Sequence, residues 1–132
     1  MSKGNKSKRK GTANELQLWR LLQRLDPEGN WESRTRLADG SRRPQPPTHG
    51  WDLWSESRNA FAEAKVRSAH VTIGQIRAWC REARERMSYT QQGFVVFRQS
   101  GSSEWWAAYP WFDRDHFQML PLADWLELLS KQ

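Results

Sequence analysis

The sequence predicts a single α/β domain in which a mixed sheet of about five strands is flanked by helices. Three observations support this fold class. Apolar residues recur at helical spacing near both ends of the chain, side chains alternate with a period of two in a central hairpin, and residues 93–98 form a continuous apolar run typical of a strand buried on both faces. The 132 residues suit one domain. The expected order is helix, three strands, helix, two strands, helix.

Residues 1–10, MSKGNKSKRK, are too polar to be buried, so we expect a flexible basic arm before a domain that spans residues 11–132. Two interpretations stay open for this arm. It is either a solubilising tail or a phosphate-contacting segment that acts through Lys8, Arg9 and Lys10.

Thr12 or Asn14 can cap a first helix that runs to about Leu25 and ends at the DPEG sequence. Its apolar stripe consists of Leu16, Trp19, Leu22 and Leu25. Residues 30–37 alternate in polarity and predict the first strand. The Pro-rich residues 38–50 then predict a loop that is long enough to be functional or mobile.

The hairpin at residues 51–66 is the centre of the predicted fold. Residues 51–54 form one strand, residues 55–59 a polar turn, and residues 60–66 a second strand. Because side chains two apart share a face, Glu63 and Lys65 point the same way. With Asp52 on the paired strand, they can form a pocket for a hard cation.

The second half of the chain continues the α/β pattern. Thr72 and Gln75 have the spacing of a capping box, and the helix that follows has an expected buried stripe of Ile73, Ile76, Trp79, Ala83 and Met87. Residues 93–98 and 104–109 predict two strands. A short segment over residues 113–117 and an amphipathic helix from Pro121 complete the domain, with Leu128 and Trp111 as spare apolar surface for a partner subunit.

Charge and composition narrow the function classes. Lys and Arg number 21 against 15 Asp and Glu, and the formal charge of +6 favours a polyanionic partner. One cysteine excludes an intramolecular disulfide, and three scattered histidines argue against a zinc site. No stretch resembles a signal peptide or a membrane span, so we expect a soluble cytoplasmic protein with no membrane partner.

The hairpin residues also resemble a known nuclease signature. Asp52 followed by Glu63-Ala64-Lys65 is similar to the D…(D/E)-X-K pattern of the PD-(D/E)XK nuclease superfamily, with Trp51 where a Pro often precedes the Asp. Lys10-Gly11, three residues and then Glu15 resemble the opening of the archaeal and phage-type Holliday junction resolvases in that superfamily. The resemblance covers roughly Lys10 to Tyr109 and implies a restriction-endonuclease-like core.

This resemblance implies a mechanism and a set of site residues. Glu15, Asp52, Glu63 and the carbonyl of Ala64 would hold one or two Mg²⁺ ions, with Mn²⁺ as a substitute, and Lys65 would orient the attacking water or offset phosphate charge. The implied protein is a homodimer that nicks four-way DNA in recombination and repair, in a host cytoplasm if phage-encoded. The DNA contacts expected in addition to those of the arm are Arg34, Arg36, Ser41, Arg42, Arg43 and Arg67.

Three alternatives remain. The first is a general repair or restriction-type nuclease of the same superfamily. The second is a non-catalytic basic module that binds nucleic acid through its charge and its nine tryptophans. The third is a protein-interaction domain, which is supported only by the spare apolar surface of the last helix.

Overall fold

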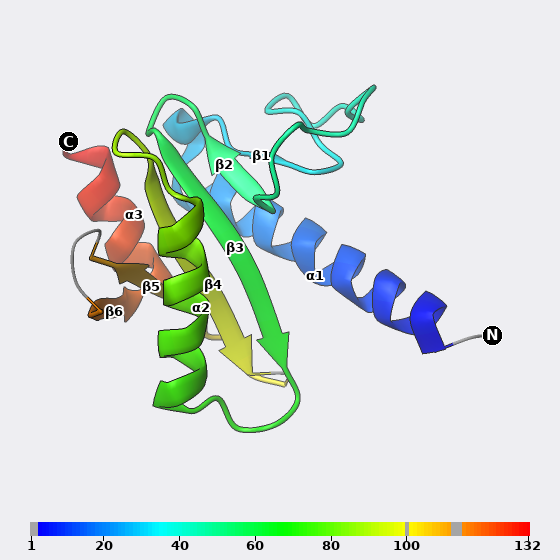
Figure 1. Ribbon diagram of the computed structural model, residues 1–132. Coiled ribbons are helices and arrows are strands. Elements are labelled where there is room, and N and C mark those ends of the chain that lie inside the picture. The colour runs from blue at the N-terminus through cyan, green and yellow to red at the C-terminus, as the bar shows by residue number, and fades with distance from the viewer. Residues whose placement is uncertain (1–2, 100, 112–114) are drawn as a thin grey trace.

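Two parallel strands, β3 (Ala60–Arg67) and β4 (Gln92–Gln99), lie at the centre of the sheet in the computed structural model (Figure 1). The structure describes residues 3–99, 101–111 and 115–132, with side chains from residue 13 onward. The helix α2 (Ile73–Arg86) makes the crossover between the two parallel strands. All other strand pairs are antiparallel.

The described sheet has six strands in the order β1-β2-β3-β4-β5-β6. The remaining elements are α1 (Lys3–Leu25), a 3-10 turn (Pro27–Gly29), β1 (Glu32–Ser33), β2 (Leu53–Ser55), β5 (Trp106–Pro110), β6 (Phe117–Pro121) and α3 (Leu122–Ser130). The predicted α/β class and mixed sheet are therefore confirmed, with one more strand than expected.

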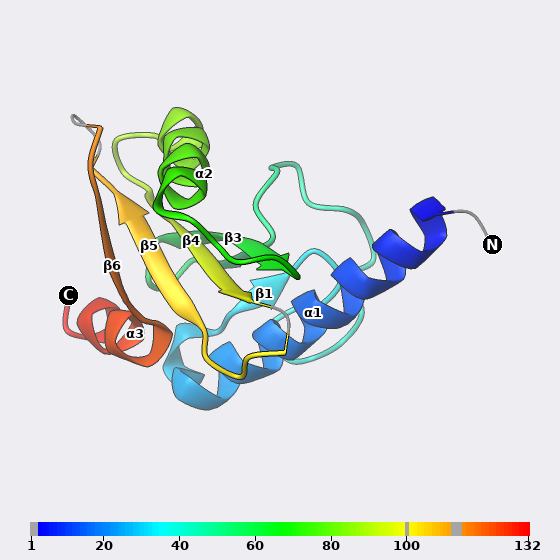
Figure 2. The ribbon, with the colours of Figure 1, turned by 90° about the horizontal axis from the view of Figure 1, so that it is seen from below.

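Helices cover both faces of the sheet. Figure 2 shows α2 on one face and α1 with α3 on the other. Leu18 and Leu22 of α1 are fully buried in the larger core with Phe94 and with Leu126 of α3. Ile76 and Trp79 of α2 are buried in a second core with Val95. The sheet thus separates two apolar layers, as is usual for α/β folds.

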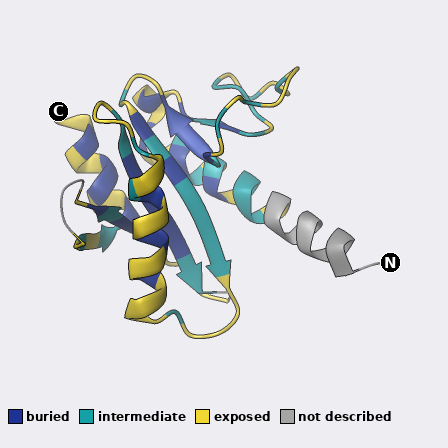
Figure 3. Ribbon diagram, viewed as in Figure 1, coloured by how far each residue is buried: buried dark blue, intermediate teal, exposed yellow. Residues whose placement is uncertain are grey.

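The buried residues of the central strand β3 lie near its start, and burial decreases toward its end (Figure 3). Its two faces also differ. Ala60 and Ala62 are fully buried in the α1 layer, and Ala64 and Val66 pack against the same core. Phe61 packs against the α2 core instead. Because side chains alternate along a strand, Glu63 and Lys65 share the face of Phe61. The sequence predicted this alternation.

The first strand is much shorter than residues 30–37. Ser33 explains this, because its hydroxyl oxygen accepts hydrogen bonds from the amides of Thr35 (3.3 Å) and Arg36 (2.9 Å). The amide of Ser33 in turn donates to the carbonyl of Arg36 at 2.9 Å. A local turn replaces the strand ladder, as a short hydroxyl side chain often permits.

Two other elements and the burial of one residue also differ from prediction. The helix α1 begins at Lys3, so its backbone includes much of the segment expected to be a flexible arm. The strand β6 occupies part of the region where only a short segment was expected, and Asp113 lies outside the described residues. Ile73 was predicted to be buried but is 57% exposed, because the capping box of Thr72 and Gln75 places it at the first turn of α2. Among the described residues, no helix is both long and apolar enough to cross a bilayer.

Candidate active site

The candidate site lies where β2 separates from β3. The strand β2 begins at Leu53, whereas β3 continues beyond the pairing partner Ala62 to Arg67. Asp52 stands at this point: its amide donates to the carbonyl of Ala62 at 3.0 Å, and its carboxylate accepts from the amide of Ala64 at 2.9 Å. The backbone of β3 therefore holds the Asp52 carboxylate at the open edge of the hairpin.

Glu15 approaches the same place from α1, on the other side of the sheet. Its carboxylate accepts a hydrogen bond from the amide of Arg34 at 3.2 Å. Burial and then the negative charge of Asp52 raise the pKa of Glu15 to about 7, against the opposing effects of the Arg34 amide and charge. Glu15 thus loses its proton at a higher pH than an ordinary carboxyl group.

Asp52 lies between the other two acids. Burial raises its pKa, the Ala64 amide opposes this, and the charge of Glu63 raises it further. Arg34 and Lys65 act in the opposite direction. The charge of Glu63 thus acts on Asp52 and the charge of Asp52 acts on Glu15, and we call these three residues the carboxylate chain.

Glu63 is held by two cations. One carboxylate oxygen lies 3.4 Å from the ammonium of Lys65, and the other accepts from the guanidinium of Arg86 at 2.5 Å. The Glu63 and Lys65 side chains are only 14% and 20% exposed. This face of β3 thus places two opposite charges in a largely buried position, where an unpaired charge would be strongly destabilising.

Arg86 was missed by sequence reasoning, although a signal was present. Trp79 and Ala83 are buried on α2, and Arg86 follows Trp79 at i+7 and Ala83 at i+3 on the same stripe. An arginine that continues a buried stripe at the end of a helix has to find a partner at the sheet. It also lies over the Trp51 ring, 5.6 Å from the ring centroid.

The donor set suits a hard divalent cation in its chemistry. Carboxylates are the ligands that Mg²⁺ prefers, and burial together with a neighbouring carboxylate raises the pKa of Glu15 (beside Asp52) and of Asp52 (beside Glu63). Within the described residues, however, no three His, Cys, Asp or Glu side chains are already gathered around one point. The hydrogen bonds explain the present arrangement, because Glu63 turns to Arg86 and Asp52 turns to the Ala64 amide.

Three predicted DNA-contacting arginines have structural partners. Arg34 donates to the carbonyls of His49 (2.8 Å) and Trp51 (3.1 Å). Arg43 donates to the Ser33 carbonyl and to Glu32, and Arg36 donates to the Gly40 carbonyl. These contacts attach the loop of residues 34–50 to the sheet, so the loop has defined structure.

The other predicted DNA contacts are differently placed. Ser41 bonds to Asp39 and is exposed, as is Arg42. Arg67 is exposed at the end of β3, over the Trp79 ring. The side chains of Lys8, Arg9 and Lys10 lie outside the described residues.

A basic pocket adjoins the acids. It has a volume of about 630 Å³, and the residues that line it include Leu16, the neighbour of Glu15, together with Arg34, Thr35, Arg36, Arg42, Arg43 and Pro44 to Pro47. Four arginines beside a carboxylate chain are suited to receive phosphates that flank a reacting group.

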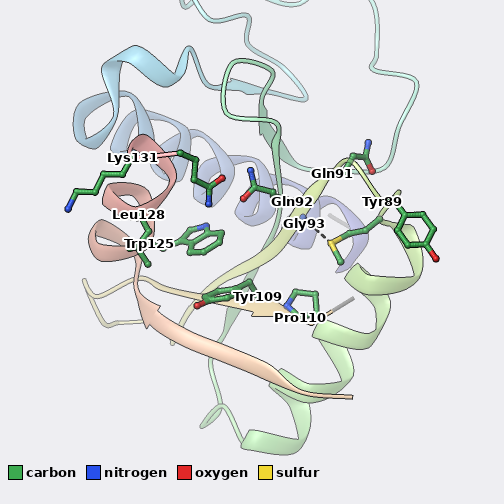
Figure 4. Close-up of a pocket in the computed structure, with 11 residues that line it drawn as sticks. Tyr89, Gln91, Gln92, Gly93, Tyr109, Pro110, Trp125, Leu128 and Lys131 are labelled. Atoms are coloured by element: carbon green, nitrogen blue, oxygen red, sulfur yellow. Dashed lines mark hydrogen bonds between the residues drawn. The ribbon is translucent and has the colours of Figure 1, made fainter. Parts of the chain in front are cut away.

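A further pocket lies elsewhere and is mainly apolar (Figure 4). It has a volume of about 750 Å³ between α3 and the segment that precedes β4, and Tyr109, Trp125 and Leu128 line one side of it. The lining residues include no carboxylate. The carboxylate chain is the better candidate site, because the raised pKa values of Glu15 and Asp52 are typical of functional sites.

Comparisons with known proteins do not assign this chain to a family. No family model, curated protein or solved structure matches this chain. A function for this chain therefore has to be argued from its residues and their geometry.

Proposed function

We propose that this protein is a Mg²⁺-dependent DNA endonuclease that hydrolyses phosphodiester bonds in the manner of the PD-(D/E)XK superfamily. One observation carries the proposal. Glu15 lies on α1, Asp52 directly before β2 and Glu63 on β3, and the charge of Asp52 raises the pKa of Glu15 while that of Glu63 raises the pKa of Asp52. The Lys65 ammonium lies beside Glu63. Perturbed acids on separate elements are typical of functional sites.

The coupled acids create a need for positive charge. Burial raises the pKa of both Glu15 and Asp52, and the charge of Asp52 raises that of Glu15 further while the charge of Glu63 does so for Asp52, so the fully ionised site is destabilised. A divalent ion held by Glu15, Asp52 and Glu63, with the carbonyl of Ala64, would remove this penalty. When bound, it would supply Lewis-acid stabilisation of the charge on the phosphate and on the leaving oxygen.

Lys65 has a role of its own. Its ammonium lies 3.4 Å from Glu63 on the open face of β3 and is 20% exposed, so it can reach a ligand at the site. There it would donate a hydrogen bond to a phosphate oxygen or hold the attacking water, and thereby offset the charge that develops during reaction. Asp52, fixed by the Ala64 amide, keeps its carboxylate in place while this happens.

The substrate that we propose is branched, four-way DNA, cut by a homodimer. The support is the resemblance of the Lys10-to-Glu15 segment to the junction resolvases, the formal charge of +6, and the four-arginine pocket beside Glu15. A positively charged surface binds the DNA backbone with little regard to sequence. Paired sites in a dimer would allow symmetrical nicks.

A cleavage panel tests the proposal. Linear duplex, nicked, flapped, single-stranded and four-way DNA are incubated with the protein in Mg²⁺, in Mn²⁺ and in EDTA. We expect paired nicks on the four-way substrate, and only with metal. Equal cleavage of all substrates would indicate a general repair or restriction-type nuclease. Absence of cleavage from every substrate in both metals would contradict the proposal.

A non-catalytic nucleic-acid-binding module is the second candidate. It is favoured by one observation, the pairing of Glu63 with both Lys65 and Arg86, which already neutralises the carboxylate without a metal. This candidate predicts salt-sensitive DNA binding that is unaffected by Mg²⁺. Measuring DNA affinity with and without Mg²⁺ therefore separates the two candidates.

A further inference from the structure

Arg86 is placed to do more than neutralise Glu63. Its guanidinium donates to the Glu63 carboxylate at 2.5 Å and to the Gly50 carbonyl at 3.4 Å, and it lies over the Trp51 ring. Its side chain is 40% exposed, whereas that of Glu63 is 14% exposed. The same guanidinium therefore has one side toward a buried carboxylate and the other toward solvent.

The contact with Glu63 conflicts with the metal role proposed for that residue. A carboxylate oxygen that accepts a short, charge-assisted hydrogen bond has to give it up before it can coordinate a cation. Arg86 is the more exposed partner and lies at the C-terminal end of α2, where the helix dipole favours a positive charge whether or not Glu63 is paired. It can therefore leave Glu63 without leaving the site, because Trp51 and Gly50 still contact it.

We propose that Arg86 is an exchange residue: it pairs with Glu63 in the metal-free protein and transfers to a phosphate of bound DNA when a divalent cation takes its place on Glu63. This inference rests on the proposed function, since it needs Glu63 to be a ligand. A guanidinium suits the second role because its planar donors match the oxygens of a phosphate.

The exchange makes cation binding and DNA binding cooperative. Without metal, Arg86 is occupied and contributes little to DNA affinity. With metal, it is released toward the phosphate and contributes a charge-assisted hydrogen bond. Linkage then requires that the cation strengthens DNA binding and that DNA strengthens cation binding by the same factor.

The test is the dissociation constant of fluorescein-labelled four-way DNA, measured by anisotropy in EDTA and in Ca²⁺ at equal ionic strength. For Arg86→Ala, we expect wild-type affinity in EDTA and about tenfold weaker binding in Ca²⁺. Arg77→Ala, which removes an exposed charge from the same helix, is the matched control and should change both values equally. An Arg86→Ala effect that is equal in EDTA and in Ca²⁺ would overturn the exchange.

Glu63→Gln gives a second and opposite expectation. It releases Arg86 without a metal, so DNA binding in EDTA should tighten, and the gain should vanish in the Glu63→Gln/Arg86→Ala double variant. A gain that persists in the double variant overturns the exchange.

The response to Ca²⁺ separates this inference from the proposed function. If Ca²⁺ strengthens DNA binding by wild-type and Arg86→Ala protein alike but not by Glu63→Gln protein, the exchange alone is wrong. If Glu63→Gln protein keeps the full response to Ca²⁺, Glu63 is not a ligand and the proposed function fails with the exchange.

Discussion

The two faces of β3 carry different kinds of side chain. On the α1 side, Ala60 and Ala62 are fully buried, and Ala64 and Val66 pack against the same apolar core. On the α2 side, the same strand presents Glu63 and Lys65, which are paired and largely buried. Burial of apolar area stabilises the first face, whereas the second carries charges that lose hydration.

The charged face of β3, on the α2 side, is the one that contributes less to the stability of the fold. A Glu–Lys pair in this position could be replaced by apolar residues at little or no loss of stability, because buried ion pairs seldom exceed their desolvation penalty. Glu15 and Asp52 add to the cost, since burial and repulsion raise the pKa of both. Perturbed charges of this kind cluster at functional sites.

Substitution on the α1 side should have the largest effect on stability. Phe94 is fully buried and contacts the rings of Trp31 and Trp125. We expect Phe94→Ala to lower the free energy of unfolding by about 3–5 kcal/mol, through lost transfer energy and a residual cavity. Denaturant unfolding measures this, with the exposed Ile73→Ala as a control that changes it by less than about 0.5 kcal/mol. Equal effects of Phe94→Ala and Ile73→Ala on the free energy of unfolding would contradict the stabilising role of the core on the α1 side.

Substitution in the carboxylate chain should affect activity instead. We expect Asp52→Asn, Glu63→Gln and Lys65→Ala each to lower the cleavage rate about 100-fold or more, because each removes charge or a donor from the reacting centre. Asp52→Asn should leave the free energy of unfolding unchanged or raised. The exposed Glu82→Gln on α2 is the matched control. Any of the three that cuts at the wild-type rate has been assigned the wrong role.

Mg²⁺ should stabilise the folded protein through the same carboxylates. At ten times the dissociation constant, binding to the native state alone adds about 1.4 kcal/mol, which raises the melting temperature by a few degrees. Thermal unfolding in Mg²⁺ and in EDTA measures the shift, and Asp52→Asn should reduce it. A melting temperature that does not change in millimolar Mg²⁺ argues against a cation site.

The smallest expected effect is a pH dependence. The folded-state pKa of Glu15 is about 7, above its ordinary value of 4.5, so the native state binds more protons than the unfolded state between these values. Stability should therefore fall as pH rises from about 4.5 to 7 and then level off as far as Glu15 is concerned. Urea unfolding at several pH values should show a shallower decline for Glu15→Gln. An equal or steeper decline in that variant would contradict the raised pKa.

The sequence predicted those parts of the fold that depend on local patterns. The alternation along β3, the capping box of Thr72 and the apolar run of β4 all follow from neighbours in the chain. The failures depend on tertiary contacts or on a competing local bond. Ser33 ended the first strand by forming its own turn, and β6 required β5 as a partner.

The residues of the candidate site also form two groups, those that the sequence predicts and those whose contacts depend on the tertiary fold. The carboxylates were selected from their spacing and from a family resemblance, and in the structure the charge of Asp52 raises the pKa of Glu15. Arg86 was missed although it continues the buried stripe of α2, because its partner Glu63 lies on another element and is reached only when α2 packs across the sheet. Arg34 was assigned to DNA, yet its donors reach the His49 and Trp51 carbonyls through folding of the loop.

The most direct measurement is the pKa of the Glu15 carboxyl, followed by NMR of the ¹³C-labelled side chain with and without Mg²⁺. Without metal, we expect a pKa of about 7. In Mg²⁺, the pKa should fall, because a cation favours the ionised form, and it should also fall in Asp52→Asn. An ordinary carboxyl pKa near 4.5 that does not respond to Mg²⁺ or to loss of Asp52 would contradict the meeting of these acids around a cation.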